Sequence, residues 1–244
     1  MNGTFRCQAA GATHAGQVRQ VNEDSFLSRP DAGLFVVADG VGGHSRGDVA
    51  SGLVVSRLAA VPPPASAPAF YAAVRDAILD ANAELRAEAG RRSVDAVATT
   101  VIALLVFDRH FACVWAGDSR LYRLREGAFE QISRDHSYVQ EMIDLGLMDP
   151  DAAEAHGKSN AVTRAVGAED TLALDAVQDE VAPGDVFVLC SDGLNKVVPD
   201  EETARIIATT PVERAPAVLV DSALARGAPD NVTVVVVRIA AAEW

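Results

Sequence analysis

The sequence LFVVADGVGGH, residues 34–44, joins an apolar run to an aspartate and a glycine-rich turn. Residues 34–38 have the continuous apolar character of a strand buried on both faces, so we expect Asp39 at the end of that strand. Gly40, Gly42 and Gly43 let the backbone turn and bring main-chain carbonyls close to whatever Asp39 holds. Because Asp-Gly after a strand more often forms a turn, this stretch alone leaves a turn and a metal site both open.

Aspartates also stand at the ends of three other predicted strands. Asp118 follows residues 111–116, Asp192 follows residues 186–190, and Asp230 comes just before residues 232–239. If the four strand ends converge, their carboxylates repel one another strongly unless cations neutralise them. Oxygen ligands without histidine or cysteine favour hard octahedral ions over zinc. The pattern therefore predicts a site for divalent cations.

A polar segment between two predicted strands, residues 18–28, places Arg19, Glu23 and Asp24 close together in the chain. Such a cluster is often only a polar loop. Beside a cation site, however, a planar guanidinium is the natural clamp for two phosphate oxygens. Glu23 and Asp24 are then candidates to hold metal-bound water or to orient the arginine.

Composition limits the class of protein. With 244 residues, 49% of them hydrophobic, and no linker-like stretch, we expect one domain over residues 1–244. A net charge of −13 argues against nucleic acid and anionic membrane as partners. Three cysteines without close pairing indicate reduced thiols, and no segment has the length of a membrane span or the pattern of a signal peptide. We therefore expect a soluble, cytoplasmic protein.

The remaining elements follow from periodicity. Apolar spacing predicts helices over residues 47–60 and 69–89, separated by a proline-rich connector. After residue 98 the sequence predicts an antiparallel meander, with His110 in a turn. Its four strands are residues 99–107, 110–116, 120–125 and 129–132. A strand near residues 8–13 and helices near residues 201–208 and 212–225 complete the expected elements.

Residues 133–167 are polar and lack a strand pattern. Ser137 is expected to cap a helix that reaches Leu145, and Asp149-Pro150 opens another short helix. Such an insertion between strands is usually a lid or a surface decoration. His136 and His156 lie in it, but no third ligand at regular spacing makes them a metal site.

Six motifs follow one another in the order and spacing of a known family. They are Arg19-x-x-Asn22-Glu23-Asp24, Asp39-Gly40-Val41-Gly42-Gly43-His44, Gly117-Asp118-Ser119-Arg120, Asn160-x-x-Thr163-Arg164-x-x-Gly167, Cys190-Ser191-Asp192-Gly193-Leu194 and Asp230-Asn231-x-Thr233. Each motif alone is weak, but together they cover nearly the whole chain. The chain therefore resembles the bacterial metal-dependent serine/threonine protein phosphatases of the PPM (PP2C) family.

The resemblance implies an α+β fold, a four-layer α/β/β/α sandwich of two antiparallel β-sheets flanked by helices. It implies hydrolysis of phosphoserine and phosphothreonine monoesters in protein substrates, without a phospho-enzyme, by direct attack of a metal-bridging hydroxide. Residues 136–163 take the place of the family's flap subdomain, which contacts substrate or gates a third metal. By analogy, the chain would be a monomer that opposes a bacterial Ser/Thr kinase acting on signalling or secretion-system proteins.

The resemblance also assigns metal ligands. Asp39 matches the residue that bridges two Mn²⁺ or Mg²⁺ ions, and the Gly40 carbonyl matches a ligand of one of them. Asp192 and Asp230 match the residues that complete the coordination of the other ion. Asp118, with Asp192 shared, matches the position that helps to hold a third ion.

The outer positions and the acid follow from the same motifs. Arg19 matches the phosphate clamp and, with Asp39 and Asp192, is expected to carry catalysis. Glu23, Asp24 and Asn231 match the residues around the coordinated water. Animal relatives place a proposed general-acid histidine directly after the Asp-Gly, where this chain has Val41. His44 and a metal-bound water are the alternatives for that role, and His44 equally suits a helix cap or loop support.

Other classes fit less well. Gly117-Asp118-Ser119 looks like the start of a GDSL-type hydrolase motif, but the five histidines all lie at or before His156, so no downstream base follows. A nucleotide-binding enzyme is a second alternative, but the glycines after Asp39 complete neither a GxGxxG nor a GxxxxGK(S/T) pattern. A catalytically weak binding or partner-switching module on the same fold is the remaining alternative, although such modules are expected to lose the acidic ligands that this chain keeps.

Overall fold

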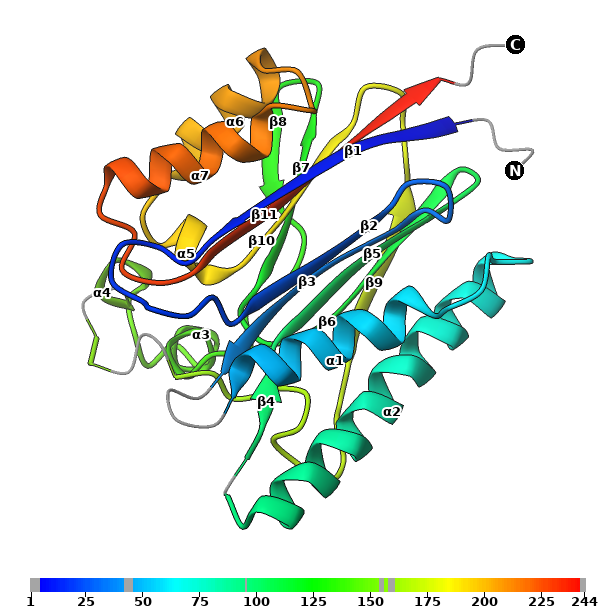
Figure 1. Ribbon diagram of the computed structural model, residues 1–244. Helices are drawn as coiled ribbons and strands as arrows, with labels where there is room; N and C mark the ends of the chain where they lie inside the picture. The colour runs from blue at the N-terminus through cyan, green and yellow to red at the C-terminus, as the bar shows by residue number, and fades with distance from the viewer. Residues whose placement is uncertain (1–4, 42–45, 95, 154–155, 158–160, 242–244) are drawn as a thin grey trace.

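The computed structural model describes residues 5–41, 46–94, 96–153, 156–157 and 161–241. Two antiparallel β-sheets lie face to face, and helices cover the outer face of each sheet (Figure 1). This arrangement confirms the α/β/β/α sandwich that the motifs imply.

The first sheet has the strand order β1-β11-β10-β7-β8. β11 pairs with β1 along ten residues, and its run of valines suits a strand with both faces buried. The strands of this sheet are β1 (Phe5–His14), β7 (Arg120–Arg125), β8 (Ala128–Gln131), β10 (Val186–Cys190) and β11 (Val232–Ala241).

The second sheet has the order β2-β3-β5-β6-β9, and the short β4 pairs with β3. Its strands are β2 (Asp24–Arg29), β3 (Leu34–Val41), β4 (Ala98–Thr99), β5 (Val101–Phe107), β6 (His110–Ala116) and β9 (Asp175–Glu180). Successive side chains of β3 enter different cores. Phe35 packs between the sheets with Phe187, whereas Leu34 and Val36 pack toward the outer helices. Burial of this strand on both faces is therefore confirmed.

Helices α1 (Gly47–Ala59) and α2 (Ala67–Arg92) cover the second sheet, whereas α6 (Asp200–Thr209) and α7 (Ala215–Ala225) cover the first (Figure 1). α2 begins two residues earlier than predicted, because the Ser66 hydroxyl accepts a hydrogen bond from the Ala69 amide at 3.3 Å. The helix that Ser137 was predicted to cap is α3 (Tyr138–Asp144), and Ser137 Oγ accepts from the Gln140 amide at 3.3 Å. None of the helices within the described ranges is long and apolar enough to cross a membrane.

The predicted four-stranded meander is wrong. β5 and β6 form a hairpin in the second sheet, while β7 and β8 form a hairpin in the first. The chain crosses between the sheets at Gly117, whose φ of +117° and contact with the Thr100 side chain exclude a Cβ. This crossing places Asp118 where the two sheets meet. His110 begins β6 instead of lying in the preceding turn.

β9 was not predicted. Its sequence, DAVQDE, has mostly exposed side chains, and it joins the edge of the sheet beside β6. An edge strand buries little apolar surface, so it leaves only a weak hydrophobic pattern in the sequence.

Candidate metal centre

The four predicted aspartates meet at the end of the sandwich opposite the chain termini, where α3, α4 (Pro150–Ala153) and α5 (Asp192–Asn195) also lie (Figure 1). Asp39 lies partly buried among them. Burial raises its pKa well above the usual range for an aspartate, and four neighbouring carboxylates raise it further. In decreasing order of effect, these neighbours are Asp24, Asp192, Asp118 and Asp230.

The prediction that Asp39 ends its strand is wrong. β3 continues to Val41, because Gly40 and Val41 pair with β4. The Asp39 backbone is held at both ends of its peptide unit, since Thr100 Oγ1 accepts from its amide at 3.0 Å and the Thr100 amide donates to its carbonyl at 2.8 Å. Thr100 Oγ1 also lies 2.7 Å from Ser119 Oγ, which connects Asp39 to the crossing segment that carries Asp118.

Gly40 lies directly against the first residue of α1. A Cβ on Gly40 would lie 2.4 Å from the backbone of Gly47. Glu23 holds the same contact, because its carbonyl accepts from the Gly40 amide at 3.2 Å and its Oε1 accepts from the Gly47 amide at 3.0 Å. Glu23 therefore fixes the loop, the strand and the helix start relative to one another.

Asp24 is the cross-strand partner of Asp39 in the β2–β3 pair. Its Oδ2 accepts from Ser191 Oγ at 2.7 Å, whereas its Oδ1 is buried without a hydrogen-bond partner among the described residues. Burial raises the pKa of Asp24 to about 6. A buried carboxylate oxygen beside another carboxylate needs a proton or a cation, which is the electrostatic signature of a cation site.

Two basic side chains compensate part of this negative charge. Arg19 donates from Nε to Asp230 Oδ1 at 2.9 Å and from a terminal nitrogen to Oδ2 at 2.8 Å. Lys196 Nζ lies 2.5 Å from Asp192 Oδ2 and 3.9 Å from Asp118 Oδ2. The sequence interpretation missed Lys196, although its position one helical turn after Asp192 was a usable signal.

Asp118 is more deeply buried than Asp192 and Asp230. Only 6% of its side chain is exposed, against 17% for Asp192 and 40% for Asp230. Burial, followed by the charge of Asp192, raises the pKa of Asp118 to about 7. A nearby cation would therefore favour its charged form.

Asn231 fastens the Arg19 loop to the start of β11. Its Oδ1 accepts from the Glu23 amide at 2.8 Å, and its Nδ2 donates to the carbonyls of Ala15 and Val21 at 2.9 and 3.0 Å. The order of the loop that carries Arg19 thus depends on a side chain adjacent to Asp230.

His136, at the start of the predicted flap, supports the Asp118 segment. The Gly117 amide donates to His136 Nδ1 at 3.1 Å, and the His136 amide donates to the Gly117 carbonyl at 2.9 Å. Because Nδ1 accepts a hydrogen bond, the neutral ring carries its proton on Nε2, which lies 3.2 Å from Asp175. His136 is thus a structural link between the start of the predicted flap and the Asp118 segment.

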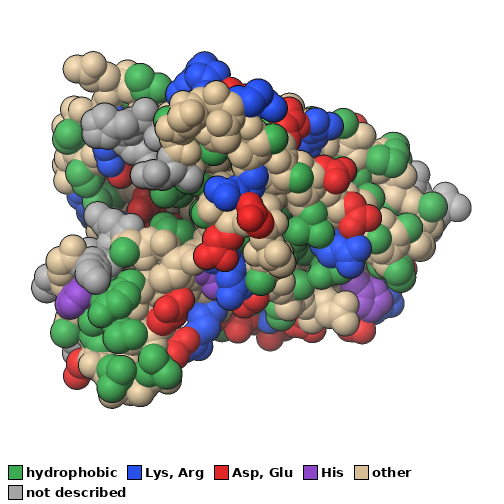
Figure 2. Space-filling view, turned by 90° about the horizontal axis from the view of Figure 1, so that it is seen from below, with side chains coloured by type: hydrophobic (Ala, Val, Ile, Leu, Met, Phe, Trp, Pro, Cys, Tyr) green, Lys and Arg blue, Asp and Glu red, His purple; other side chains and the backbone are tan. Residues whose placement is uncertain are grey.

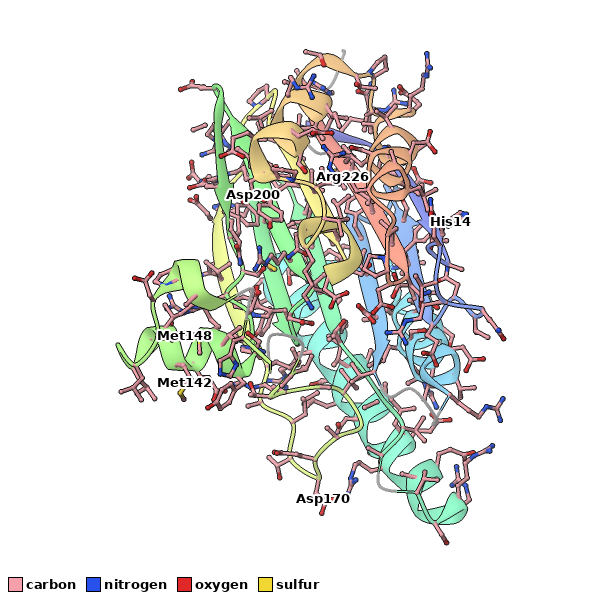
Figure 3. The ribbon with its side chains drawn as sticks, turned by 90° about the vertical axis from the view of Figure 1, so that its left-hand side faces the viewer. His14, Met142, Met148, Asp170, Asp200 and Arg226 are labelled. Carbon is pink, nitrogen blue, oxygen red and sulfur yellow. The ribbon has the colours of Figure 1, made fainter. Side chains whose placement is uncertain are left out.

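Side chains on the surface surround this cluster unevenly. Viewed from below, acidic side chains lie inside a recess at the left-hand end of the molecule, beside the lobe formed by α3 and α4 (Figure 2). That lobe exposes apolar side chains, including Leu145 and Leu147. Met142 and Met148 lie on the same lobe (Figure 3). Gly42, Gly43, His44 and Asn160, which the motifs single out, lie outside the described residues.

The residues present fit divalent cations by their chemistry. They supply carboxylate oxygens, including a buried oxygen of Asp24 without a hydrogen-bond partner among the described residues. As they are placed, the described acidic, histidine and cysteine side chains form no group of three that could hold an ion. Asp230 is paired with Arg19, and Asp192 is paired with Lys196, so each of these carboxylates already has a positively charged partner.

A family model described as Protein phosphatase 2C matches residues 10–225. The chain belongs to the protein phosphatase 2C family. The family, together with a manganese-containing relative described below, implies divalent metal ions as cofactors.

Three relatives illustrate the similarity. PppA of Pseudomonas aeruginosa, described as a key regulatory component of T6SS, is 45% identical, with a TM-score of 0.90 and coverage of 96% of this chain and 98% of PppA. The serine/threonine protein phosphatase PstP of Mycobacterium tuberculosis is 35% identical over 97% of this chain but 46% of PstP, so the chain spans about half the length of that relative. The catalytic domain of PstP, solved with 2 manganese ions, is 33% identical and has a TM-score of 0.86. The match covers 97% of this chain and 100% of that domain.

Proposed function

We propose that this protein removes phosphate from phosphoserine and phosphothreonine in proteins, in a reaction that depends on Mn²⁺ or Mg²⁺. The observation that carries the proposal is the convergence of four aspartates from separate parts of the chain. Asp118, Asp192 and Asp230 lie close enough to Asp39 for their charges to raise its pKa. Similarity to PstP, whose catalytic domain was solved with 2 manganese ions, supports it.

Each acid then has a role in holding the ions. Asp39 and the Gly40 carbonyl, with Asp192 and Asp230, would hold two ions, and Asp118 with Asp192 would hold a third. When bound, the ions supply an activated water and neutralise charge on the phosphoryl oxygens.

The surrounding residues hold the substrate and the cluster. Arg19 would bind two phosphoryl oxygens with the fork that holds Asp230 in this structure. Glu23, Asp24 and Asn231 would keep the loop and the water shell in place, as their hydrogen bonds to neighbouring elements suggest. The proton for the leaving group would come from His44 or from water.

We further propose that the substrates are proteins phosphorylated by a bacterial Ser/Thr kinase, in the cytoplasm, and that the enzyme acts as a monomer. The 45% identity to PppA supports substrates in a secretion system. A binding module without activity is the alternative, and retention of the four aspartates argues against it.

Phosphate release from a phosphothreonine peptide tests the proposal. Activity should require Mn²⁺, vanish with a chelator, and fall at least about 100-fold in Asp192→Ala because a ligand is lost. Asp170→Ala is the matched control, since this aspartate has 88% of its side chain exposed and lies at the far lower end of the molecule (Figure 3). Activity indifferent to both chelation and Asp192→Ala would defeat the proposal, and inactivity with every metal would favour the binding module.

A further inference from the structure

The acidic cluster contains a cation that belongs to the chain itself. Lys196 is the C-cap residue directly after the short helix α5, which Asp192 begins. Its Nζ contacts one oxygen of Asp192 at 2.5 Å and one oxygen of Asp118 at 3.9 Å. The ammonium therefore joins carboxylates from two different segments, one after β10 and one at the crossing between the sheets.

Local structure holds Lys196 in this place. The Lys196 amide donates to the Asp192 carbonyl at 3.1 Å, so the two side chains leave the same turn of backbone. The Asp118 and Asp192 side chains are 6% and 17% exposed, and Lys196 itself is 35% exposed. A counter-ion matters most at such shielded carboxylates, because water screens their charge poorly.

Under the proposed function, a metal ion would use the same pair of carboxylates. If Asp118 and Asp192 held a divalent cation jointly, that cation and the Lys196 ammonium would both contact the same two side chains. Two positive charges bound to the same two carboxylates repel each other, so the ammonium and the ion compete for the pair.

The choice of lysine allows the ammonium to leave. Of the 21 basic residues only two are lysines, Lys158 and Lys196. The buried carboxylate of Asp185, by contrast, is held by an arginine fork from Arg125. An arginine fork fixes both oxygens of a carboxylate, whereas a lysine is a point charge on a flexible stem that can swing away.

We propose that Lys196 is a displaceable counter-ion that competes with a divalent cation for the Asp118–Asp192 pair and keeps cation binding there weak. The inference rests on the proposed function, because it takes these two aspartates to hold metal. In it, Lys196 tunes the cofactor content of the site without contacting the substrate.

Titration of metal-free protein with Mn²⁺, followed by calorimetry and by the magnetic resonance signal of unbound Mn²⁺, tests the proposal. Lys196→Met removes the charge and keeps the length of the side chain, so its weakest Mn²⁺ site should bind about tenfold more tightly, and Lys196→Arg should bind there more weakly. Arg75→Met removes an equal charge from an exposed pair with Asp76 and should bind Mn²⁺ as the wild type does.

Thermal unfolding provides a readout that is independent of activity. In a chelator, Lys196→Met should unfold at a lower temperature than the wild type, because two shielded carboxylates lose their counter-ion. In saturating Mn²⁺ the difference should disappear or reverse. Lys196→Gln serves in the same comparison if Lys196→Met does not fold.

The two proposals fail in different ways. Wild type that binds Mn²⁺ and releases phosphate, with neutral Lys196 variants that bind Mn²⁺ equally or less tightly, would overturn the counter-ion role alone. Wild type that binds no Mn²⁺ and releases no phosphate would overturn the function and this inference together.

Discussion

Replacing Asn231 by alanine should detach the loop that carries Arg19 from the start of β11. The amide side chain is buried and makes three hydrogen bonds, one accepted from the Glu23 amide and two donated to the carbonyls of Ala15 and Val21. Alanine leaves all three backbone groups without these partners. The loop should therefore lose its order before the rest of the fold does.

The size of the effect follows from this count. A hydrogen bond contributes about 1 kcal/mol net, so three of them give a loss of about 3 kcal/mol in the free energy of unfolding. Urea unfolding in the presence of chelator measures it. Because Arg19 is the proposed phosphate clamp, the KM for a phosphopeptide should also rise about tenfold, and the inhibition constant of inorganic phosphate should rise with it.

Asn82→Ala is the matched control. Asn82 is also buried, donates to the Glu169 carbonyl at 3.0 Å and accepts from the Gly167 amide at 2.7 Å, but it ties a different loop to α2. Its loss should lower stability without raising KM. The reasoning is refuted if Asn231→Ala unfolds at the wild-type urea concentration, or if both variants change KM alike.

Two further perturbations test the packing and the charge of the site. Gly40→Ala places a Cβ 2.4 Å from the backbone of Gly47, so it should lower the unfolding free energy by about 3 kcal/mol, whereas Gly52→Ala on α1 meets nothing within 4 Å and should stabilise by about 1 kcal/mol; urea midpoints measure both. The pKa of Asp118 is raised from 3.8 to about 7 in the metal-free fold. Protonation of this side chain therefore stabilises the fold fully below about pH 4, and this stabilisation is lost as the pH rises through 7. In chelator, Asp118→Asn should therefore gain at least about 1 kcal/mol over the wild type between pH 5 and pH 8, and an unchanged difference would contradict the raised pKa.

The positions of the aspartates could be predicted because each one adjoins an uninterrupted apolar run. Such a run is a local signal, and the strands before Asp118 and Asp192 and after Asp230 formed as predicted. The exact end of the strand could not be read in the same way. Asp39 lies inside β3, because β4, a strand of two residues, adds a partner that its own short sequence does not reveal.

The crossing between the sheets was harder to predict from the sequence. Four strands joined by tight turns are typical of a meander, and nothing local tells which hairpin joins which sheet. Gly117 carries the only local sign, a glycine at a position where the backbone needs a positive φ. β9 gave still less, since an exposed edge strand does not require apolar residues.

The charge balance of the site depends on pairs that only the fold creates. Arg19 and Asp230 are 211 residues apart, yet the guanidinium uses two nitrogens on that one carboxylate. The same fork cannot hold Asp230 and two phosphoryl oxygens together, so a cation that takes over Asp230 also makes Arg19 available to phosphate. By thermodynamic reciprocity, an anion that takes Arg19 must then favour the cation at Asp230 to the same extent. The acids alone, which the sequence displays, would not have suggested the coupling between metal and substrate that the proposed roles of Arg19 and Asp230 imply.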